Sequence, residues 1–357
     1  MAKRIFIDPG DFYTKIVAYD YTGGSGKFIG RSFFPSIVFP VQEKKENILY
    51  YEHEDQFYKI GYDCTNVTVG MINDRTNKKV SDFTYSDLVG RLILKKAIFD
   101  YTDEKDDLEI ALVIGSPRKL EIFSRVVEKM MTGNNDRVVV DAFRGYDRRR
   151  LTKSARVNID FKSAGDGIFG LIRKIKEGFT SALVVDIGYN NSSVYVVRAN
   201  EGVEATRLID NGAGDYFKSI AKLMESSKRE NISFLWMVKQ VELGCKEIDS
   251  EENGEDFDVT QVLNNVRWDL NKIFYAAVSD IITSYFANTT KGIDMLVVIG
   301  GGAALSGELL YHSLVEGGFK FNDCYIEQST MYPILNDIDQ FIDQSEDKTV
   351  EKIRKAQ

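Results

Sequence analysis

The stretch IFIDPGDFYTKI, residues 5–16, decides the fold that this sequence predicts. An apolar run ends at Asp8-Pro9-Gly10 and apolar character resumes over Thr14–Tyr19, a pattern typical of a β-hairpin. The same unit returns in ALVVDIGYNNSSVYVV (182–197), which places Asp186 178 positions after Asp8 (186 − 8). Because half of the chain separates the two copies, we predict two similar domains, each with one hairpin in a shared cleft.

A third turn, Gly300-Gly301-Gly302, follows the apolar strand Met295–Ile299 and precedes helical spacing over Ala303–Leu314. Apolar strands are also predicted at 108–114 and 182–186, and they alternate with helical patterns such as 86–99 and 259–287. Alternating strands and helices of this kind indicate the α/β fold class.

An Asp-x-Gly hairpin suits the chemistry of phosphate and magnesium. Glycine permits positive φ and a close approach of backbone N–H groups, which cradle phosphate oxygens. A carboxylate at a strand end can hold the waters of Mg²⁺. Either hairpin alone is more often an ordinary β-turn, and the glycine triplet alone is more often a strand–helix turn. The three features together predict a nucleotide site.

Composition narrows the class of protein. A chain of 357 residues exceeds one ordinary core, and its net charge of −8 argues against direct binding to DNA or to an anionic membrane. Three scattered cysteines suggest a reducing compartment, and only His53 and His312 are present, which disfavours a zinc site or a Ser-His-Asp triad. With no signal peptide or membrane span expected, we predict a cytoplasmic protein.

Five stretches carry a resemblance to the superfamily of actin, heat-shock chaperones and sugar kinases. Residues 5–16 and 182–197 resemble its two phosphate loops, and LVVIGGGAALSGELL (296–310) resembles its adenosine motif. KSAGDGIFGLIRK (162–174) is similar to its connecting helix, and MYPILNDIDQF (331–341) to a terminal signature of plasmid and archaeal actin-like proteins. Chain length and this signature favour the ParM-like branch, filament-forming ATPases that segregate plasmids.

The resemblance implies an actin-like fold, in which two similar α/β domains with ribonuclease H-like cores flank a nucleotide cleft. Domain I is expected over 1–160, with a smaller inserted subdomain at about 30–90 and a C-terminal return over 325–357. Domain II is expected over 161–324.

The resemblance also implies site residues. Asp8 and Asp186 would hold Mg²⁺ through water, and Asp166 would orient the attacking water, although it is equally suited to cap a helix. The residues expected to bind the nucleotide are Gly10, Asp11, Phe12, Tyr13 and Lys15 in the first loop, Gly188, Tyr189, Asn190 and Asn191 in the second, Gly212, Asp215, Lys239 and Glu242 on the nucleoside side, and Gly300, Gly301 and Gly302 against the adenosine.

Some positions depart from the family pattern. Asp11 adds a carboxylate beside phosphate, so its side chain is expected to turn away or to cap the hairpin. Asn190 stands where glycine is usual, which predicts a positive φ there. Leu335 and Gln340 replace an alanine and a glycine of the terminal signature.

The leading hypothesis is an ATPase that uses ATP (or GTP) and Mg²⁺ and self-associates head to tail into helical filaments. Its expected partner is a DNA-binding adaptor on a centromere-like DNA site, with plasmid DNA segregation as the outcome and no membrane involved. The alternatives are a monomeric small-molecule kinase of the same superfamily and a nucleotide-bound cytoskeletal scaffold. The cationic stretch RGYDRRRLTKSAR (144–156) is either a contact to an acidic protomer or a DNA-bound adaptor, or a solvated loop before a strand.

Overall fold

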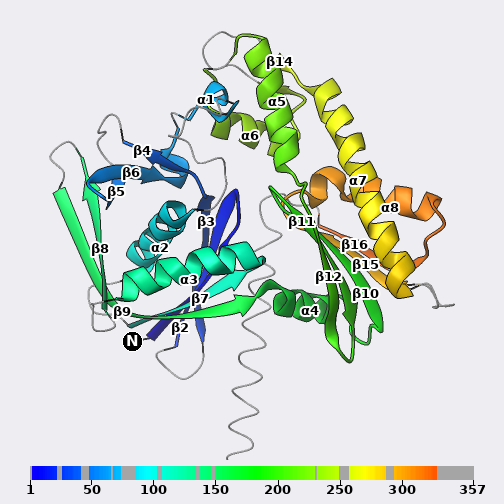
Figure 1. Cartoon of the computed structure of the whole chain (residues 1–357), viewed down its shortest axis with the longest axis horizontal. Coiled ribbons are helices and arrows are strands. Elements are labelled where there is room, and N and C mark those ends of the chain that lie inside the picture. The colour runs from blue at the N-terminus through cyan, green and yellow to red at the C-terminus, as the bar shows by residue number, and fades with distance from the viewer. Residues whose placement is uncertain are drawn as a thin grey trace, which may run out of the picture. The chain divides into compact units, whose positions relative to one another are not determined.

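The computed structural model divides the chain into two compact units, Met1–Ser163 and Ala164–Gln357 (Figure 1). The residues that it describes are 2–21, 26–41, 48–65, 67–73, 86–102, 107–132, 137–145, 149–229, 231–248, 257–286 and 293–327. Within these residues, no helix is both long enough and apolar enough to cross a membrane.

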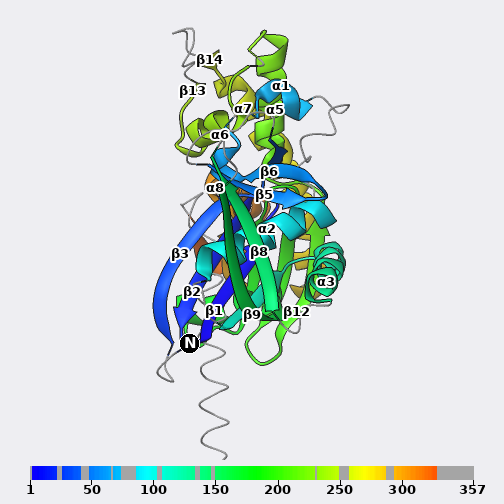
Figure 2. The same cartoon turned by 90° about the vertical axis from the view of Figure 1, so that its left-hand side faces the viewer.

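The first unit is built on a nine-stranded sheet in the order β3-β2-β1-β7-β9-β8-β5-β6-β4. The strands are β1 (Ala2–Pro9), β2 (Tyr13–Asp20), β3 (Lys27–Pro35), β4 (Val38–Pro40), β5 (Leu49–His53), β6 (Gln56–Ile60), β7 (Asp107–Ile114), β8 (Arg137–Arg144) and β9 (Arg149–Ser163). Strands β1, β7 and β9 are parallel, and β2, β3 and β8 each run antiparallel to a neighbour. Figure 2 shows β8 and β9 as long neighbouring strands.

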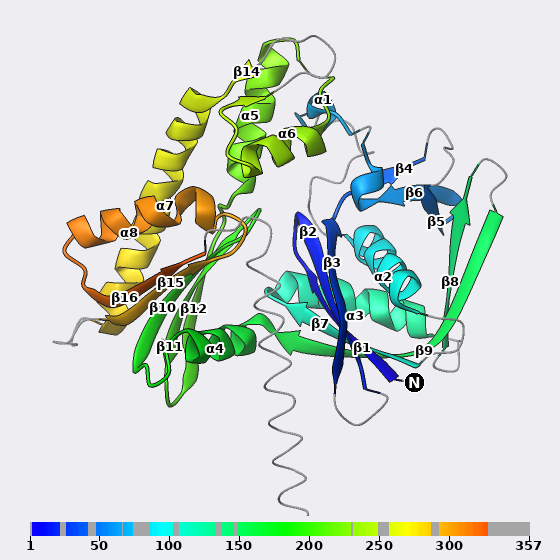
Figure 3. The ribbon, with the colours of Figure 1, turned by 180° about the vertical axis from the view of Figure 1, so that it is seen from behind.

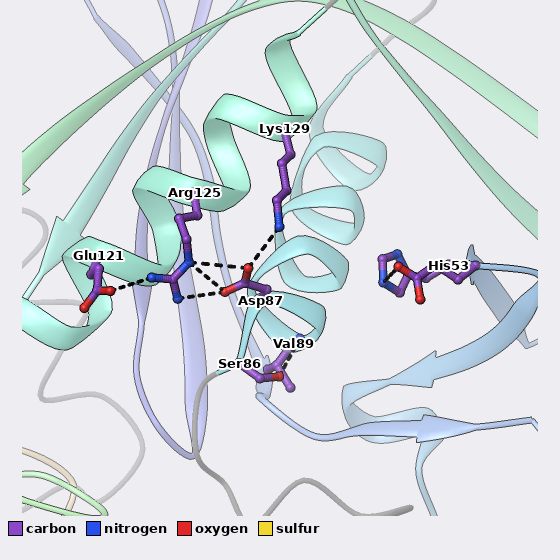
Figure 4. A network of polar contacts seen from close by, with 8 residues as sticks. His53, Ser86, Asp87, Val89, Glu121, Arg125 and Lys129 are labelled. Carbon is purple, nitrogen blue, oxygen red and sulfur yellow. Dashed lines mark hydrogen bonds and ion pairs between the residues drawn. The ribbon is translucent and has the colours of Figure 1, made fainter.

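Helices α2 (Asp87–Tyr101) and α3 (Pro117–Met131) join β1 and β7 in one apolar core, whereas α1 (Val69–Asn73) is a short helix after the 3₁₀ turn Gly61–Asp63. Ser86 caps α2, since its Oγ accepts a hydrogen bond from the Val89 N–H at 3.3 Å. Asp87 binds Arg125 and Lys129 of α3, and Arg125 also binds Glu121 (Figure 4). These ion pairs tie the two helices together at the surface.

The second unit has a five-stranded sheet in the order β12-β11-β10-β15-β16 and a separate two-stranded ribbon, β13-β14. Its strands are β10 (Ser181–Ile187), β11 (Ser192–Arg198), β12 (Gly202–Ile209), β13 (Glu247–Ile248), β14 (Phe257–Asp258), β15 (Ile293–Ile299) and β16 (Phe321–Ile326). Its helices are α4 (Ala164–Ile175), α5 (Gly214–Ser226), α6 (Phe234–Glu242), α7 (Thr260–Phe286) and α8 (Ala303–Glu316).

Two apolar cores cover the two faces of this sheet (Figure 3). Helix α4 packs on one face against Val184 and Val297, and helices α7 and α8 pack on the other against Leu183 and Val185. Consecutive residues of β10 thus point into opposite cores, which explains why residues 182–185 of this strand are all apolar.

Each unit contains the same five-stranded arrangement. The order β3-β2-β1-β7-β9 matches β12-β11-β10-β15-β16, with antiparallel and parallel pairs in the same places. A register shift falls between Ala18 and Tyr19 in one unit and between Val196 and Val197 in the other. The offset between these shifts, 178 residues (197 − 19), equals the offset between Asp8 and Asp186. The predicted α/β class is confirmed, and the repeat seen in the sequence is a repeat of whole sheets.

The cationic stretch 144–156 is not a simple loop. Arg144 ends β8 and Arg149 begins β9, so that most of the stretch is paired strand. The sequence did not predict that β9 begins at Arg149, because the first residues of this strand are mostly charged and only a few of its side chains, such as Ala155, are buried.

The C-terminal part of the sequence is described only up to residue 327. Residues 325 and 326 belong to β16, which pairs in parallel with β15 of the second unit. The rest of the expected return to domain I, together with the stretch MYPILNDIDQF, lies outside the described residues.

Candidate nucleotide site

The first hairpin joins β1 to β2, and an ion pair bridges the two strands next to its turn. The antiparallel register sets Asp8 opposite Lys15, and Lys15 Nζ lies 2.9 Å from Asp8 Oδ2. The Lys15 side chain is only 8% exposed and that of Asp8 22%. An ammonium group that is this strongly desolvated needs an anion, and Asp8 provides one within the hairpin itself.

Gly10 is required by close packing rather than by its backbone angle. Its φ is not positive, but a Cβ at this position would collide with the Tyr13 carbonyl oxygen. Ser36 braces the same turn: its Oγ donates to the Gly10 carbonyl at 2.7 Å, and its N–H donates to the Phe12 carbonyl at 2.6 Å. These carbonyl oxygens, which would repel a phosphate, are therefore engaged within the unit.

Asp11 is held by a lysine of a helix. Its Oδ1 lies 2.8 Å from Lys119 Nζ on α3, and its side chain is 10% exposed. This carboxylate was expected to turn away from a phosphate or to cap the hairpin, and in the structure it forms an ion pair with Lys119 of α3. Phe12 is buried and its ring lies edge-on to that of Tyr13 at 4.6 Å.

The second hairpin joins β10 to β11 and is braced by backbone. The carbonyls of Ile187, Gly188 and Tyr189 accept hydrogen bonds from three N–H groups of other turns. These donors are Gly302 at 2.9 Å, Ala213 at 2.8 Å and Gly214 at 2.7 Å. Three turns that are far apart in the sequence thus meet at the end of β10 that carries Asp186.

Glycines make this meeting possible. A Cβ on Gly212 would collide with the carbonyls of Gly188 and Tyr189, and a Cβ on Gly188 with that of Asn191. Gly300 has φ +92°, and a Cβ there would lie 2.6 Å from the Ile187 carbonyl oxygen. Any side chain at these positions would separate the turns.

Tyr189 and Asn190 are anchored by helix α5. The Tyr189 ring stacks on Phe217 with a centroid distance of 5.9 Å, and Lys218 Nζ donates to Asn190 Oδ1 at 3.3 Å. Asn190 does not have the positive φ that we predicted, since the residues around it form a longer turn than a two-residue hairpin needs.

The remaining predicted residues lie on different elements. Asp215, at the start of α5, accepts hydrogen bonds from Asn211 Nδ2 at 3.1 Å and from the Gly212 N–H at 3.3 Å, so it orders the turn that supports the second hairpin. Gly301 lies between Gly300 and Gly302 in the third turn. Lys239 and Glu242 lie on α6, where Lys239 Nζ sits 5.8 Å from the centre of the Trp236 ring. Asp166 lies in the first turn of α4, and its side chain is outside the described part of the chain.

The two hairpin carboxylates, Asp8 and Asp186, fit a magnesium ion that keeps most of its bound water. The described residues contain no group of three or more His, Cys, Asp or Glu side chains that would enclose a metal. Mg²⁺ with nucleotides is usually bound by one or two carboxylates, substrate phosphates and water, which requires no such group. Each hairpin provides one carboxylate of this kind, Asp8 or Asp186.

Comparison with known structures places this geometry in context. An archaeal actin homologue superposes with a TM-score of 0.62 at 13% identity, over 96% of this chain and 99% of that one. A ParM from the 15-stranded filament of Clostridium botulinum gives 0.62 at 14% identity, over 95% of this chain and 98% of that one. The chain has the actin-like fold. The actin homologue in complex with ADP superposes with a TM-score of 0.61 at 13% identity, over 96% of this chain and 99% of that one.

Sequence comparison alone does not reach these relatives. No protein-family model matches the actin-like chain, and no curated protein sequence matches it. At 13–14% identity, the likeness is carried by the order and direction of the strands rather than by the side chains.

Three bracing residues escaped the sequence reasoning. Ser36, Lys119 and Lys218 contact Gly10, Asp11 and Asn190 from 26, 108 and 28 positions away. Of these three, only Lys119 could have been anticipated from the sequence. The extra carboxylate of Asp11 in a phosphate loop indicates that a nearby cation must neutralise it, although not which one.

Proposed function

We propose that this actin-like chain binds Mg-ATP with its two hairpins, hydrolyses it, and self-associates into filaments whose turnover follows the nucleotide. The observation that carries the proposal is the repeat of one hairpin in both units. In each, an Asp-x-Gly sequence ends a central strand, and its turn carbonyls are engaged by the protein itself. Such turns offer an anion a backbone that does not repel it.

The residues take the roles expected from the sequence. Asp8 and Asp186 hold the waters of Mg²⁺, and Lys15 neutralises phosphate charge. When a nucleotide binds, its phosphates compete with Asp8 for the Lys15 ammonium, which frees the carboxylate to face the hydrated metal. Mg²⁺ supplies charge neutralisation of the phosphates in this scheme.

The remaining predicted residues complete the nucleotide contacts. The first turn contributes Gly10, Asp11, Phe12 and Tyr13 through backbone, and the second contributes Gly188, Tyr189, Asn190 and Asn191. Gly212, Asp215, Lys239 and Glu242 serve the nucleoside, and Gly300, Gly301 and Gly302 the adenosine. The ADP complex of the archaeal homologue supports nucleotide as the ligand class, with ATP favoured over GTP by sequence resemblance.

Self-association is supported by the filament structures among the relatives. One of them is the 15-stranded ParM filament, and another is a filament of Alp12, with a TM-score of 0.52 at 15% identity over 94% of this chain. We extend the proposal to plasmid DNA segregation in the cytoplasm, through a DNA-binding adaptor on a centromere-like site.

Assembly is tested by light scattering at 90° over a series of protein concentrations. With Mg-ATP, scattering should rise above a threshold concentration and decay as phosphate is released. Without nucleotide, or with EDTA, it should stay flat. A flat trace with Mg-ATP at all concentrations would refute filament formation.

Asp166 is tested by separating assembly from hydrolysis. Asp166→Ala should assemble with Mg-ATP but release phosphate about 10–100-fold more slowly, because a positioned water is lost while the phosphate contacts remain. Asp160→Ala, a change of the same kind on exposed β9, is the control. Equal rates of phosphate release in wild type and Asp166→Ala would exclude the water-positioning role.

A further inference from the structure

The tip of the β8–β9 hairpin carries two arginines that face each other. The antiparallel register sets Arg144 directly opposite Arg149, and both side chains are exposed. Like charges in directly opposed positions destabilise a strand pair. Neighbouring Arg150 is neutralised by Asp141 at 2.6 Å, but among the described residues no ion pair reaches Arg144 or Arg149. Arg144 and Arg149 therefore present positive charge at the described end of this hairpin.

The β13–β14 ribbon of the second unit shows the reverse pattern. Its register sets Glu247 directly opposite Asp258, and both are exposed. Ile248 beneath them is fully buried, and the Arg229 guanidinium lies 5.1 Å from the centre of the Phe257 ring, so the ribbon is fastened to its unit. The ribbon therefore presents a fixed pair of carboxylates. Lys246, next to Glu247, is the nearest cation in the sequence.

The two pairs match in geometry as well as in charge. Directly opposed residues of any antiparallel pair are separated by about 5 Å, so the two guanidinium groups and the two carboxylates start from the same spacing. Guanidinium and carboxylate groups also form paired hydrogen bonds of defined geometry.

The whole chain shares this polarity. Residues 1–163 hold 27 Lys and Arg against 24 Asp and Glu, a net charge of +3, whereas residues 164–327 hold 15 against 24, a net charge of −9. A protomer with one basic and one strongly acidic unit attracts further copies of itself in a head-to-tail sense, because the surfaces in contact differ.

We propose that the arginine tip, Arg144 and Arg149, docks on the carboxylate ribbon, Glu247 and Asp258, of a second copy of this chain. The contact rests on the self-association proposed above and assigns it a surface. Because the two patches are different parts of the same chain, each copy has one of each to offer, and the contact propagates. Single exposed ion pairs contribute little, so the effect depends on all four groups and on the net charges behind them.

Charge reversal with complementary mixing tests the contact. The tip variant is Arg144→Glu/Arg149→Glu, and the ribbon variant is Glu247→Lys/Asp258→Asn. Asparagine keeps an oxygen for the Thr260 N–H, which Asp258 Oδ1 accepts at 2.8 Å at the start of α7. Arg137→Glu/Arg156→Glu, the other directly opposed arginine pair of the same hairpin, is the matched control. The amount of protein that sediments with Mg-ATP is measured for wild type and for each variant at 50 and 300 mM KCl.

At 50 mM KCl, the tip and ribbon variants should each raise the critical concentration by about tenfold or more, with the control within about twofold of wild type. A one-to-one mixture of tip and ribbon variants should pellet again, because each then meets an opposite charge. Raising the salt concentration to 300 mM should increase the critical concentration of wild type towards that of the variants, because salt screens the charges. If the tip variant does not fold, judged by thermal melting, Arg144→Gln/Arg149→Gln should give a smaller rise, of about threefold.

Several results would overturn the proposal. Unchanged pelleting of both variants would refute the surface while leaving filament formation intact, and absence of pelleting by wild type would refute both. Failure of the mixture to recover would indicate that the two pairs do not meet across copies. If labelled duplex DNA binds wild type but not the tip variant, and assembly is unaffected, the tip serves nucleic acid instead.

Discussion

The two hairpins hold equivalent positions in two copies of one sheet, yet they are braced by different means. Opposite Asp8 the first hairpin has Lys15, whereas opposite Asp186 the second has Ser193. The first hairpin is held mainly by the ion pairs Asp8–Lys15 and Asp11–Lys119 and by Ser36. The second is held mainly by backbone N–H groups of two glycine turns, with side chains of α5 against Tyr189 and Asn190. One loop geometry can thus be maintained either by charge or by close backbone packing.

The difference predicts different sensitivities. The ion pairs of Asp8 and Asp11 make the first hairpin depend on charge and salt, although Gly10 in its turn also has no room for a Cβ. Backbone bracing is independent of charge but leaves no room for a Cβ. We expect the second hairpin to fail through packing and the first through electrostatics.

The largest effect is expected from Gly300→Ala in the third turn, which packs against the second hairpin. Its φ of +92° and the approach to the Ile187 carbonyl should together destabilise the second unit by about 3 kcal/mol. Urea denaturation measures the loss. Gly178→Ala is the matched control, since Gly178 has φ +74° with open space around it and should cost only about 1 kcal/mol. Equal losses in the two variants would show that the third turn is not closely packed.

Lys15→Ser places a serine opposite Asp8, as Ser193 lies opposite Asp186 in the second hairpin. Loss of a charged donor to phosphate should weaken Mg-ATP binding by about 10–100-fold, as measured by calorimetry. Lys95→Ser is a control lysine of the same unit, whose Nζ donates to the Glu52 carbonyl at 2.7 Å. ATP affinity that is unaltered in Lys15→Ser would remove Lys15 from the nucleotide site.

Asp11→Asn tests whether the extra carboxylate of the first hairpin is structural. The substitution removes the ion pair between this carboxylate and Lys119, so the free energy of unfolding should fall by about 1 kcal/mol. Mg-ATP affinity should remain within about twofold, since Asp11 is expected to serve phosphate through its backbone. A large gain in affinity would mean that the carboxylate repels phosphate despite Lys119.

The smallest effect concerns the ion pairs between Asp87 of α2 and two cations of α3, the helix that also carries Lys119. Hydrogen bonds from Arg125, more than those from Lys129, lower the pKa of Asp87 below its usual value near 3.8. This stabilisation is present above the unfolded-state pKa and is lost as the pH falls through the lower folded-state pKa. Asp87→Asn should therefore lower the melting temperature by about 2 °C at pH 7, and the gap should close below about pH 4. A gap that persists at pH 2 would show that charge is not its cause.

Much of the fold could be predicted because the decisive signals are local. Apolar strands ending in Asp-x-Gly or Gly-Gly-Gly locate β1, β10 and β15, and their order implies the repeated sheet. The strand from Arg149 was missed since its few inward residues are separated by charged ones, and pairing with β7 and β8, rather than its own composition, makes it a strand.

The sequence predicted the positions of the two hairpins but not the contacts that hold them. Glycine at 10 and 188 was attributed to positive φ and to a close approach of backbone N–H groups, whereas the structure shows carbonyl groups that approach both residues closely. The partners that decide this, such as Ser36 for the first turn and Gly212 for the second, are brought in by tertiary packing. The local sequence of each hairpin does not show which distant residues will contact it.

The central claim is that both hairpins serve one nucleotide, and the stoichiometry of Mg-ATP binding tests it most directly. Isothermal titration calorimetry below the assembly threshold should give one ATP per chain. Lys15→Ser in the first hairpin and Asp186→Asn in the second should each reduce the affinity of that single site. Two sites per chain, each sensitive to only one of the substitutions, or no binding at all, would contradict the account.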